Sequence, residues 1–359
     1  MKGIFYITTL LVLGLSSISA ETWKNPADRY SEAYKVYLDA QFPIPVDSIK
    51  NFVYFARDRE AMRTSPFLMN SRFVGAQIMY PWALLEPEKD SYDFSMIRED
   101  YEYLKSKSRK LFVQLQDATF TSTFNAAPGY LLSKEYDGGA IYQRDDSGRP
   151  EGWVAKRWNL KVRDRFTKLL AALGREFDGK IEGINLQETA IGVSNKEDPT
   201  FSGVAYAEAI KANMLSMKKA FSRSVAMQYA NFMPDEWLPW DDKGYLRSVY
   251  AYGEQIGVGL GGPDLMFTKK GQLNHTIAMM HENRFTVPMG IAVQDGNYIG
   301  ETGTGRVVNG HKNIVPVLHD FAKDFLRVNY MFWASQEPYF TQDVLPSFPP
   351  MKESTTASR

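Results

Sequence analysis

The chain has 359 residues, a length that suits one large domain or two of ordinary size. Its 42 lysine and arginine residues balance its 42 aspartate and glutamate residues, so the formal net charge is zero and a surface that binds nucleic acid is not expected. The hydrophobic fraction of 44% is ordinary for a globular domain, and the absence of cysteine excludes disulfides and a lipoprotein anchor.

The first twenty residues predict a secretory signal peptide. Lys2 supplies a positive start, Ile4 to Leu15 is almost wholly apolar, and serines followed by Ala20 offer a cleavage point. We therefore expect export to the periplasm or the medium, with an uncleaved N-terminal anchor as the alternative. No later stretch approaches the roughly 18 uninterrupted apolar residues of a spanning helix, so no membrane span is expected in the mature chain.

Short apolar runs then alternate with longer amphipathic segments, such as 162–177 and 205–221. Eight runs are predicted to be strands: Phe52–Ala56, Phe73–Met79, Leu111–Leu115, Ile181–Leu186, Val225–Met227, Ile256–Leu260, Val287–Val293 and Val328–Trp333. Continuous apolar strands are typical of a parallel sheet buried on both faces, and intervening helices indicate βα units. The count of eight favours a closed (β/α)8 barrel, the TIM barrel, over an open doubly wound sheet.

The predicted organisation is a signal peptide (1–20), an N-terminal extension that packs on the barrel (21–49), the barrel (50–345) and a C-terminal tail (346–359). Residues 119–158 are expected to form one extended loop after the third strand. In such barrels the functional side chains lie at the carboxyl ends of the strands. Those ends read Gln116-Asp117, Gln187-Glu188, Gln228-Tyr229, Gln294-Asp295, and Trp333 followed closely by Glu337.

A sequence motif after the second strand carries a family resemblance. Trp82-Ala83-Leu84-Leu85-Glu86-Pro87, followed by Tyr92-Asp93-Phe94, resembles the second-strand signature of retaining barrel glycosidases, the clan of β-galactosidases, cellulases and xylanases. The resemblance implies a glycoside hydrolase whose general acid/base glutamate ends strand four, the place of Glu188. It also implies a nucleophilic glutamate after strand seven and an aromatic residue after strand eight, where Trp333 matches.

Two positions depart from that pattern. Gln187 stands where the clan has an asparagine before its acid/base, and strand seven ends in Gln294-Asp295 without a glutamate. The nucleophile is therefore expected to be Asp295 or Glu337. Each carboxylate also has a structural alternative, because Glu188 suits a helix cap, Asp295 an Asp-Gly turn, and Glu337 a strand end before proline.

Glycoside hydrolysis needs two carboxyl groups that flank the glycosidic bond. We expect the rings of Trp82, Tyr229 and Trp333 to stack on sugar faces. The amides of Gln116, Gln187, Gln228 and Gln294 suit hydroxyl groups, since an amide both donates and accepts. Asp117 and Asp264 are expected to orient substrate or to cap the helices that follow them. The four histidines include no pair at a strand end, so no metal and no cofactor are expected.

The sequence thus predicts an exported glycoside hydrolase that cleaves a polysaccharide or oligosaccharide through paired carboxylates, with Glu188 as general acid/base. The alternative is a catalytically inactive glycan-binding barrel that has lost the strand-seven nucleophile. A lyase or transglycosylase would share the same pocket. The sequence carries no signal for oligomeric state.

Overall fold

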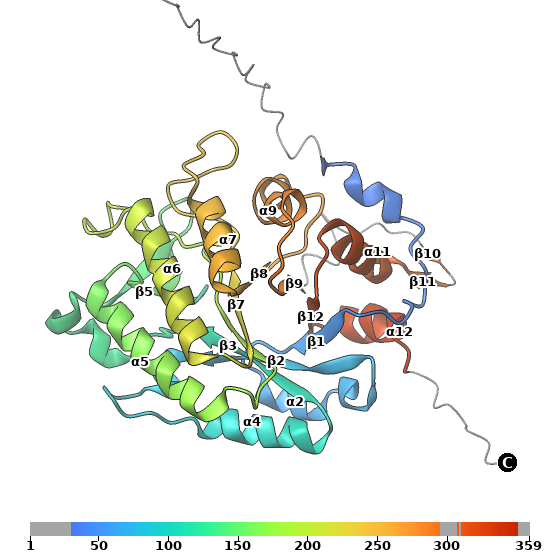
Figure 1. Ribbon diagram of the computed structural model, residues 1–359, viewed down its shortest axis with the longest axis horizontal. Helices are drawn as coiled ribbons and strands as arrows, with labels where there is room; N and C mark the ends of the chain where they lie inside the picture. Colours follow the sequence, from blue (N-terminus) through green and yellow to red (C-terminus); the bar gives the residue numbers. More distant parts are fainter. Residues whose placement is uncertain (1–29, 295–306, 309, 351–359) are drawn as a thin grey trace, which may run out of the picture.

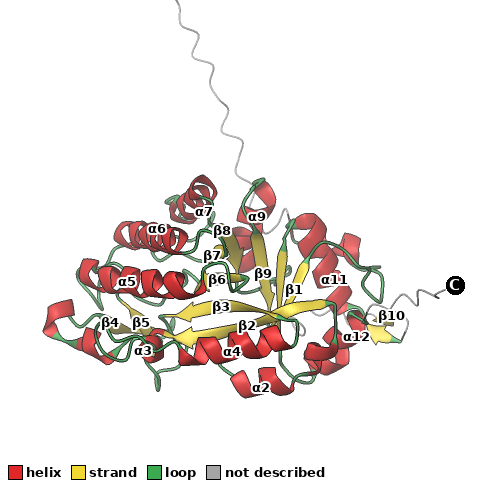
Figure 2. Ribbon diagram, turned by 60° about the horizontal axis from the view of Figure 1, so that its bottom comes forward, coloured by secondary structure: helices red, strands yellow, loops and turns green. Residues whose placement is uncertain are grey.

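The computed structural model describes residues 30–294, 307–308 and 310–350. Its centre is a closed barrel of parallel strands in the order β1-β12-β9-β8-β7-β6-β3-β2. The barrel strands are β1 (Lys50–Tyr54), β2 (Phe73–Pro81), β3 (Lys110–Gln116), β6 (Gly183–Leu186), β7 (Val225–Tyr229), β8 (Gly259–Gly262), β9 (Met289–Val293) and β12 (Tyr330–Ala334). The predicted (β/α)8 barrel is confirmed (Figures 1 and 2).

Helices follow the strands and surround the barrel (Figure 2). They are α2 (Arg59–Thr64), α3 (Trp82–Leu85), α4 (Ser95–Ser106), α5 (Leu160–Phe177), α6 (Gly203–Ala220), α7 (Tyr245–Ile256), α8 (Lys270–Gln272), α9 (Ala278–Glu282), α11 (Ile314–Asp320) and α12 (Leu345–Ser347). Single turns of other helix types complete the set: η1 (Ala33–Tyr37), η2 (Pro66–Met69), η3 (Gly129–Leu132), η4 (Lys134–Tyr136), η5 (Leu273–Ile277), η6 (Phe321–Phe325) and η7 (Phe340–Val344). In the part of the chain that the structure describes, no helix combines the length and apolarity of a bilayer crossing.

One predicted strand was misplaced. The apolar run expected to begin at Ile256 is split, because Ile256 ends α7 and the strand β8 starts at Gly259. Gly257 separates the two elements with a φ of 73°, the left-handed conformation in which helices commonly end. Apolar periodicity alone does not distinguish the last turn of a packed helix from the start of a buried strand.

The barrel interior is filled by aromatic side chains in its middle and at its amino end. Phe52, Phe112, Tyr330 and Phe332 contact one another with ring centroids 5.0 to 6.3 Å apart. Side chains at every second position of a strand share one face. Gln114 and Gln116 therefore face the barrel interior, as Phe112 does, but lie closer to the carboxyl end of β3. The interior therefore changes from apolar to polar toward the carboxyl ends of the strands.

The long loop after β3 contains regular structure of its own. Within residues 119–158 lie η3, η4 and an antiparallel hairpin formed by β4 (Ala140–Arg144) and β5 (Pro150–Ala155). A bridge between Ala118 and Val154 attaches the hairpin to the chain leaving β3. The expected extended loop is thus largely a folded hairpin beside the carboxyl end of the barrel.

The two ends of the described chain pack together on one side of the barrel, near α11 and the hairpin of β10 (Val307–Val308) and β11 (His311–Lys312) (Figure 1). The Tyr34 ring stacks on Phe267 with centroids 4.9 Å apart, and the Ile44 backbone N–H donates to the Ser347 carbonyl at 2.9 Å. Phe348 is fully buried against Phe73 and Trp333. Packing therefore continues past residue 345, where the sequence placed the end of the barrel.

Candidate active site

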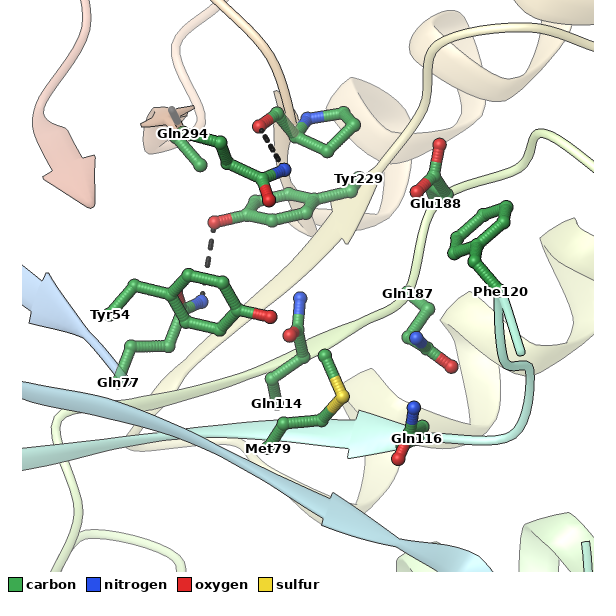
Figure 3. A pocket seen from close by; sticks show the side chains of 12 residues that line it. Tyr54, Gln77, Met79, Gln114, Gln116, Phe120, Gln187, Glu188, Tyr229 and Gln294 are labelled. Atoms are coloured by element: carbon green, nitrogen blue, oxygen red, sulfur yellow. Dashed lines mark hydrogen bonds between the residues drawn. The ribbon is translucent and has the colours of Figure 1, made fainter. Parts of the chain in front are cut away.

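A cavity of about 120 Å³ opens at the carboxyl end of the barrel (Figure 3). Its walls come from seven of the barrel strands or the loops that follow them, and from the loop before the β4–β5 hairpin. The lining residues are Tyr54, Gln77, Met79, Gln114, Gln116, Phe120, Gln187, Glu188, Tyr229, Pro263, Ala292 and Gln294. Among these described residues Glu188 is the one carboxylic acid, and none is a lysine or arginine. The wall therefore suits an uncharged ligand rich in hydroxyl groups.

Glu188 follows β6 by two residues and is partly buried. Its Oε2 accepts a hydrogen bond from the Asn231 side chain at 2.6 Å, and Asn231 in turn follows β7. Burial raises the pKa of Glu188 to about 7; the Asn231 hydrogen bond opposes this shift, and the negative charge of Asp264 adds to it. With a pKa of about 7, a substantial fraction of Glu188 is protonated at neutral pH and can donate its proton.

Two glutamines of β3 line the cavity and have side-chain oxygens without a hydrogen-bond donor among the described residues. These are Gln114 and Gln116, which are 6% and 5% exposed. An unsatisfied buried acceptor costs about 1–3 kcal/mol. Both residues line the cavity, and their polar amides suit a ligand with hydroxyl groups better than an apolar one.

The other predicted cavity residues are held by the protein itself. Gln187 accepts from the backbone N–H groups of Asp117 and Ala118 at 2.9 and 2.8 Å, which fixes its amide beside Glu188. The Tyr229 hydroxyl accepts from Gln77 at 3.2 Å. Figure 3 shows Glu188 and Phe120 at one end of the lining and Tyr54 and Gln77 at the other.

Gln294 ties β9 to the chain that follows β8. Its amide donates to the Pro263 carbonyl at 3.1 Å and to the Asp264 carboxylate at 3.2 Å. The charge of Asp264 raises the pKa of Glu188 and, less strongly than burial does, the pKa of Tyr54. Asp264 is therefore a second carboxylate close to the cavity.

Asp117 and Gln228 lie behind the cavity wall, next to one another. Asp117 is 4% exposed and accepts two hydrogen bonds from Arg157, at 2.7 and 2.6 Å. The Gln228 amide donates to the carbonyls of Gln187 and Tyr229, both at 2.7 Å. Both side chains thus support the loop that carries Glu188, and neither lines the cavity.

The two tryptophans expected to stack on sugars are fully buried on the helix side of the barrel. Trp82 donates to Glu86 at 2.8 Å and packs against Phe166, while Trp333 donates to Asn51 at 2.8 Å and packs against Phe348. Neither ring lines the cavity. The motif after β2 therefore acts in packing: Glu86 receives the Trp82 N–H and a buried ion pair from Arg165.

The predicted nucleophiles have different positions. Glu337 is exposed, accepts hydrogen bonds from the Thr341 hydroxyl at 2.5 Å and backbone N–H at 3.3 Å, and does not line the cavity. Asp295 lies outside the described residues. Asp264 and, with a smaller effect, Glu151 are carboxylates whose charges raise the pKa of Glu188.

Several residues that line the cavity were not among the predicted site residues, and one of them, Gln114, could have been identified from its spacing in the sequence. Gln114 precedes Gln116, a predicted site residue, by two positions, so the two side chains share one face of β3. Phe120 and Met79 carried no comparable signal. Among the described residues, no group of histidine and carboxylate side chains is arranged to hold a metal ion.

No protein-family model matches the sequence, and no curated protein matches it. Solved structures do match. The catalytic domain of β-amylase from Paenibacillus polymyxa aligns over 86% of this chain and 96% of its own, with 9% identity and a TM-score of 0.53.

Two other solved structures match with similar TM-scores. GH5_18 from Streptomyces cattleya in complex with Manβ1-4GlcNAc aligns over 79% of this chain and 70% of its own, at 10% identity and a TM-score of 0.52. Endo-glycoceramidase II from Rhodococcus sp. aligns over 80% and 73%, at 11% identity and a TM-score of 0.50. At these identities the likeness concerns the fold, and the predicted resemblance to barrel glycoside hydrolases is confirmed at that level.

Proposed function

We propose that this protein is a glycoside hydrolase in which Glu188 protonates the leaving oxygen of a glycosidic bond. The observation that carries the proposal is one carboxyl group, with its pKa raised to about 7, in a cavity otherwise lined by neutral and amide side chains at the carboxyl end of a (β/α)8 barrel. Barrel enzymes place their chemistry at this end. Because likeness in fold does not by itself establish activity, the site carries the argument.

Hydrolysis requires a second carboxylate, which either attacks the sugar or activates water. Our first candidate is Asp264, because its charge acts on Glu188 and Gln294 holds it at the end of β8. Asp295, which follows β9, is the candidate from the sequence. In the step itself, Glu188 transfers its proton to the glycosidic oxygen as the C–O bond breaks, and the second carboxylate supplies or activates the nucleophile that takes the sugar carbon.

The experiment is hydrolysis of a panel of neutral polysaccharides and oligosaccharides by the purified protein, followed by reducing-end release. Glu188→Gln should lower the rate of release by about 10²–10⁴-fold. Asp264→Asn and Asp295→Asn identify the second carboxylate, since only its loss should approach the effect at Glu188. Glu337→Gln is the matched control and should retain activity. Binding of a glycan without release by the wild-type protein would favour the inactive glycan-binding barrel.

We also propose that the chain is exported after cleavage near Ala20, on the strength of the positive start and apolar run of its first twenty residues. The N-terminus of the mature protein, determined by mass spectrometry after expression in a bacterial host, tests this. A periplasmic or secreted protein beginning at Glu21 is the expected result, and full-length protein in the cytoplasm would contradict it.

A further inference from the structure

A second and larger hollow, of about 410 Å³, lies next to the Glu188 cavity. Phe120 lines both spaces, and Ala190, two residues after Glu188, lines the larger one. Its walls are the β4–β5 hairpin, the chain after β6 and the chain after β7. We call it the hairpin groove; it is lined by Phe120, Gln143, Arg144, Asp145, Asp146, Glu151, Ala190, Ile191, Gly192, Phe232, Met233, Pro234, Glu236 and Trp237.

We propose that the hairpin groove binds further units of an uncharged oligosaccharide whose scissile bond lies at Glu188, with the Trp237 ring as the stacking surface. This inference rests on the proposed function and extends it to the substrate class. It makes the natural substrate a chain of several sugar units, not a disaccharide.

The sizes of the two spaces support an extended ligand. Ligand pockets in proteins usually measure about 300–1,000 Å³, so the cavity of about 120 Å³ at Glu188 is too small for more than part of one ligand. The hairpin groove falls within that range. Because Phe120 lines both spaces, the groove begins beside the cavity, and our proposal has a sugar chain with one bond at Glu188 continue there.

Trp237 is an exposed ring held in a fixed position. Half of its surface is exposed, and its other side stacks on Phe232 with centroids 5.6 Å apart and an interplanar angle of 8°. His275 packs against it at 4.9 Å and accepts a hydrogen bond from the Leu238 backbone N–H at 3.1 Å. Paired backbone hydrogen bonds between Trp237 and Asp241, at 3.0 and 2.8 Å, close the turn. A rigid apolar ring facing a groove loses little entropy when a ligand stacks on it.

The opposite wall is also anchored. The Gly192 backbone donates to Gln143 at 3.2 Å and accepts from the Arg144 backbone at 2.8 Å. A Cβ at Gly192 would lie 2.0 Å from the Arg144 carbonyl oxygen, so only glycine permits this approach of the hairpin. The groove is therefore a feature that the packing of three loops maintains.

The charges on the wall select against anionic sugars. Four acidic residues and one arginine line the groove. The Glu236 carboxylate accepts from three backbone N–H groups, those of Lys243, Tyr245 and Leu246. Asp145 is paired with Arg149, so Asp146 and Glu151 remain against Arg144. The remaining excess of negative charge repels uronic acids and sulfated sugars. An uncharged chain meets apolar, aromatic and amide surface without that penalty.

The test measures binding to the full-length Glu188→Gln protein by isothermal titration calorimetry. The probes are cello-, manno-, xylo- and malto-oligosaccharides of two and of six units, with hexagalacturonate as the charged comparison. We expect at least one neutral hexasaccharide to bind about tenfold more tightly than its disaccharide, with hexagalacturonate weaker. Adding Trp237→Ala should remove this gain with length, and Trp237→Phe should restore part of it.

Trp240→Ala is the matched control, because Trp240 is 59% exposed on the same loop but does not line the groove. It should leave the gain unchanged, and near-ultraviolet circular dichroism should show each variant folded. The proposal is overturned if no hexasaccharide binds more tightly than its disaccharide, if Trp240→Ala has the same effect as Trp237→Ala, or if hexagalacturonate is the tightest ligand.

The two proposals fail separately. Length-dependent binding through Trp237 without hydrolysis by the wild-type protein would support the groove and refute the hydrolase. Hydrolysis with the same ratio of hexasaccharide to disaccharide kcat/KM in wild type and Trp237→Ala would support the hydrolase and refute the groove.

Discussion

The two ends of strand β6 place glutamates in opposite environments. Glu182 precedes the strand and accepts hydrogen bonds from Lys50 and Lys110, both at 2.6 Å, and from the Tyr330 hydroxyl at 2.9 Å. Burial there favours the neutral acid, but the hydrogen bonds from the two lysines outweigh it, and the pKa of Glu182 falls below its ordinary value. Glu188 follows the strand, has an amide as its side-chain partner, and has its pKa raised to about 7.

The difference indicates that the amino end of the barrel contributes to stability, while the carboxyl end holds the groups proposed for catalysis. At the amino end a carboxylate is neutralised by cations and ties β1, β3 and β12 together. At the carboxyl end the Arg157 guanidinium donates to Asp117 and to the backbone carbonyl of Glu188. Its charge lowers the pKa of Glu188 but only partly offsets the effect of burial. An uncompensated carboxyl group is a cost to folding, and such costs are typical of functional sites.

The largest expected effect is at Glu188. Glu188→Gln removes the proton donor and should lower the rate of glycan hydrolysis by about 10²–10⁴-fold, the usual range for loss of a general acid. Its melting temperature at pH 8 should not fall, because burial disfavours the ionised form of Glu188 that is present at that pH. Retention of full activity would refute the assignment.

The reverse result is expected at the other end of the strand. Glu182→Gln should leave hydrolysis near wild type but lower the free energy of unfolding at pH 7 by about 1–2 kcal/mol, since Lys50 and Lys110 are half-exposed and solvent screens the pairs. Because the folded-state pKa of Glu182 is below the unfolded value of 4.5, this contribution is present above pH 4.5 and is lost as the pH falls through the folded-state pKa. Urea denaturation at pH 7 and pH 3 measures both points, and an equal difference at both would contradict the ion-pair explanation.

The smallest effect is a shift in the pH profile. Activity that needs protonated Glu188 should fall as the pH rises through about 7. Asp264→Asn removes a charge that raises this pKa, so the alkaline limb of kcat/KM should move to lower pH in whatever activity remains. Asn231→Ala removes a hydrogen bond that lowers it, so the limb should move to higher pH. Shifts in the same direction would show that the limb does not report Glu188.

Part of the site could be predicted from the sequence. The predictions that failed did so for one common reason. Gln116, Gln187, Glu188, Tyr229 and Gln294 were expected at strand ends, and the structure places all of them on the cavity wall. Their sequence neighbours Asp117 and Gln228, expected beside them, point away. Adjacent residues of a strand face opposite sides, and the sequence did not indicate which side faces inward.

Trp333 illustrates the same limit. Its neighbour Phe332 packs inside the barrel, while Trp333 packs against the helices. In a barrel buried on both faces, both alternating sets of residues are apolar, so the pattern identifies a strand but not its inner face. The hairpin groove could not be predicted from the sequence either, because its walls come from three segments far apart in the chain.

The sequence by itself determined the barrel, through the alternation of buried strands and amphipathic helices, and the position of Glu188 after the fourth strand. Local periodicity is enough for both, since each depends on residues close together in the chain. Only the tertiary structure decided which strand-end side chains face inward, that the charge of Asp264 acts on Glu188, and that Arg157, among the described residues, only partly offsets the effect of burial on Glu188. Those properties depend on distances between separate strands, which no local pattern encodes.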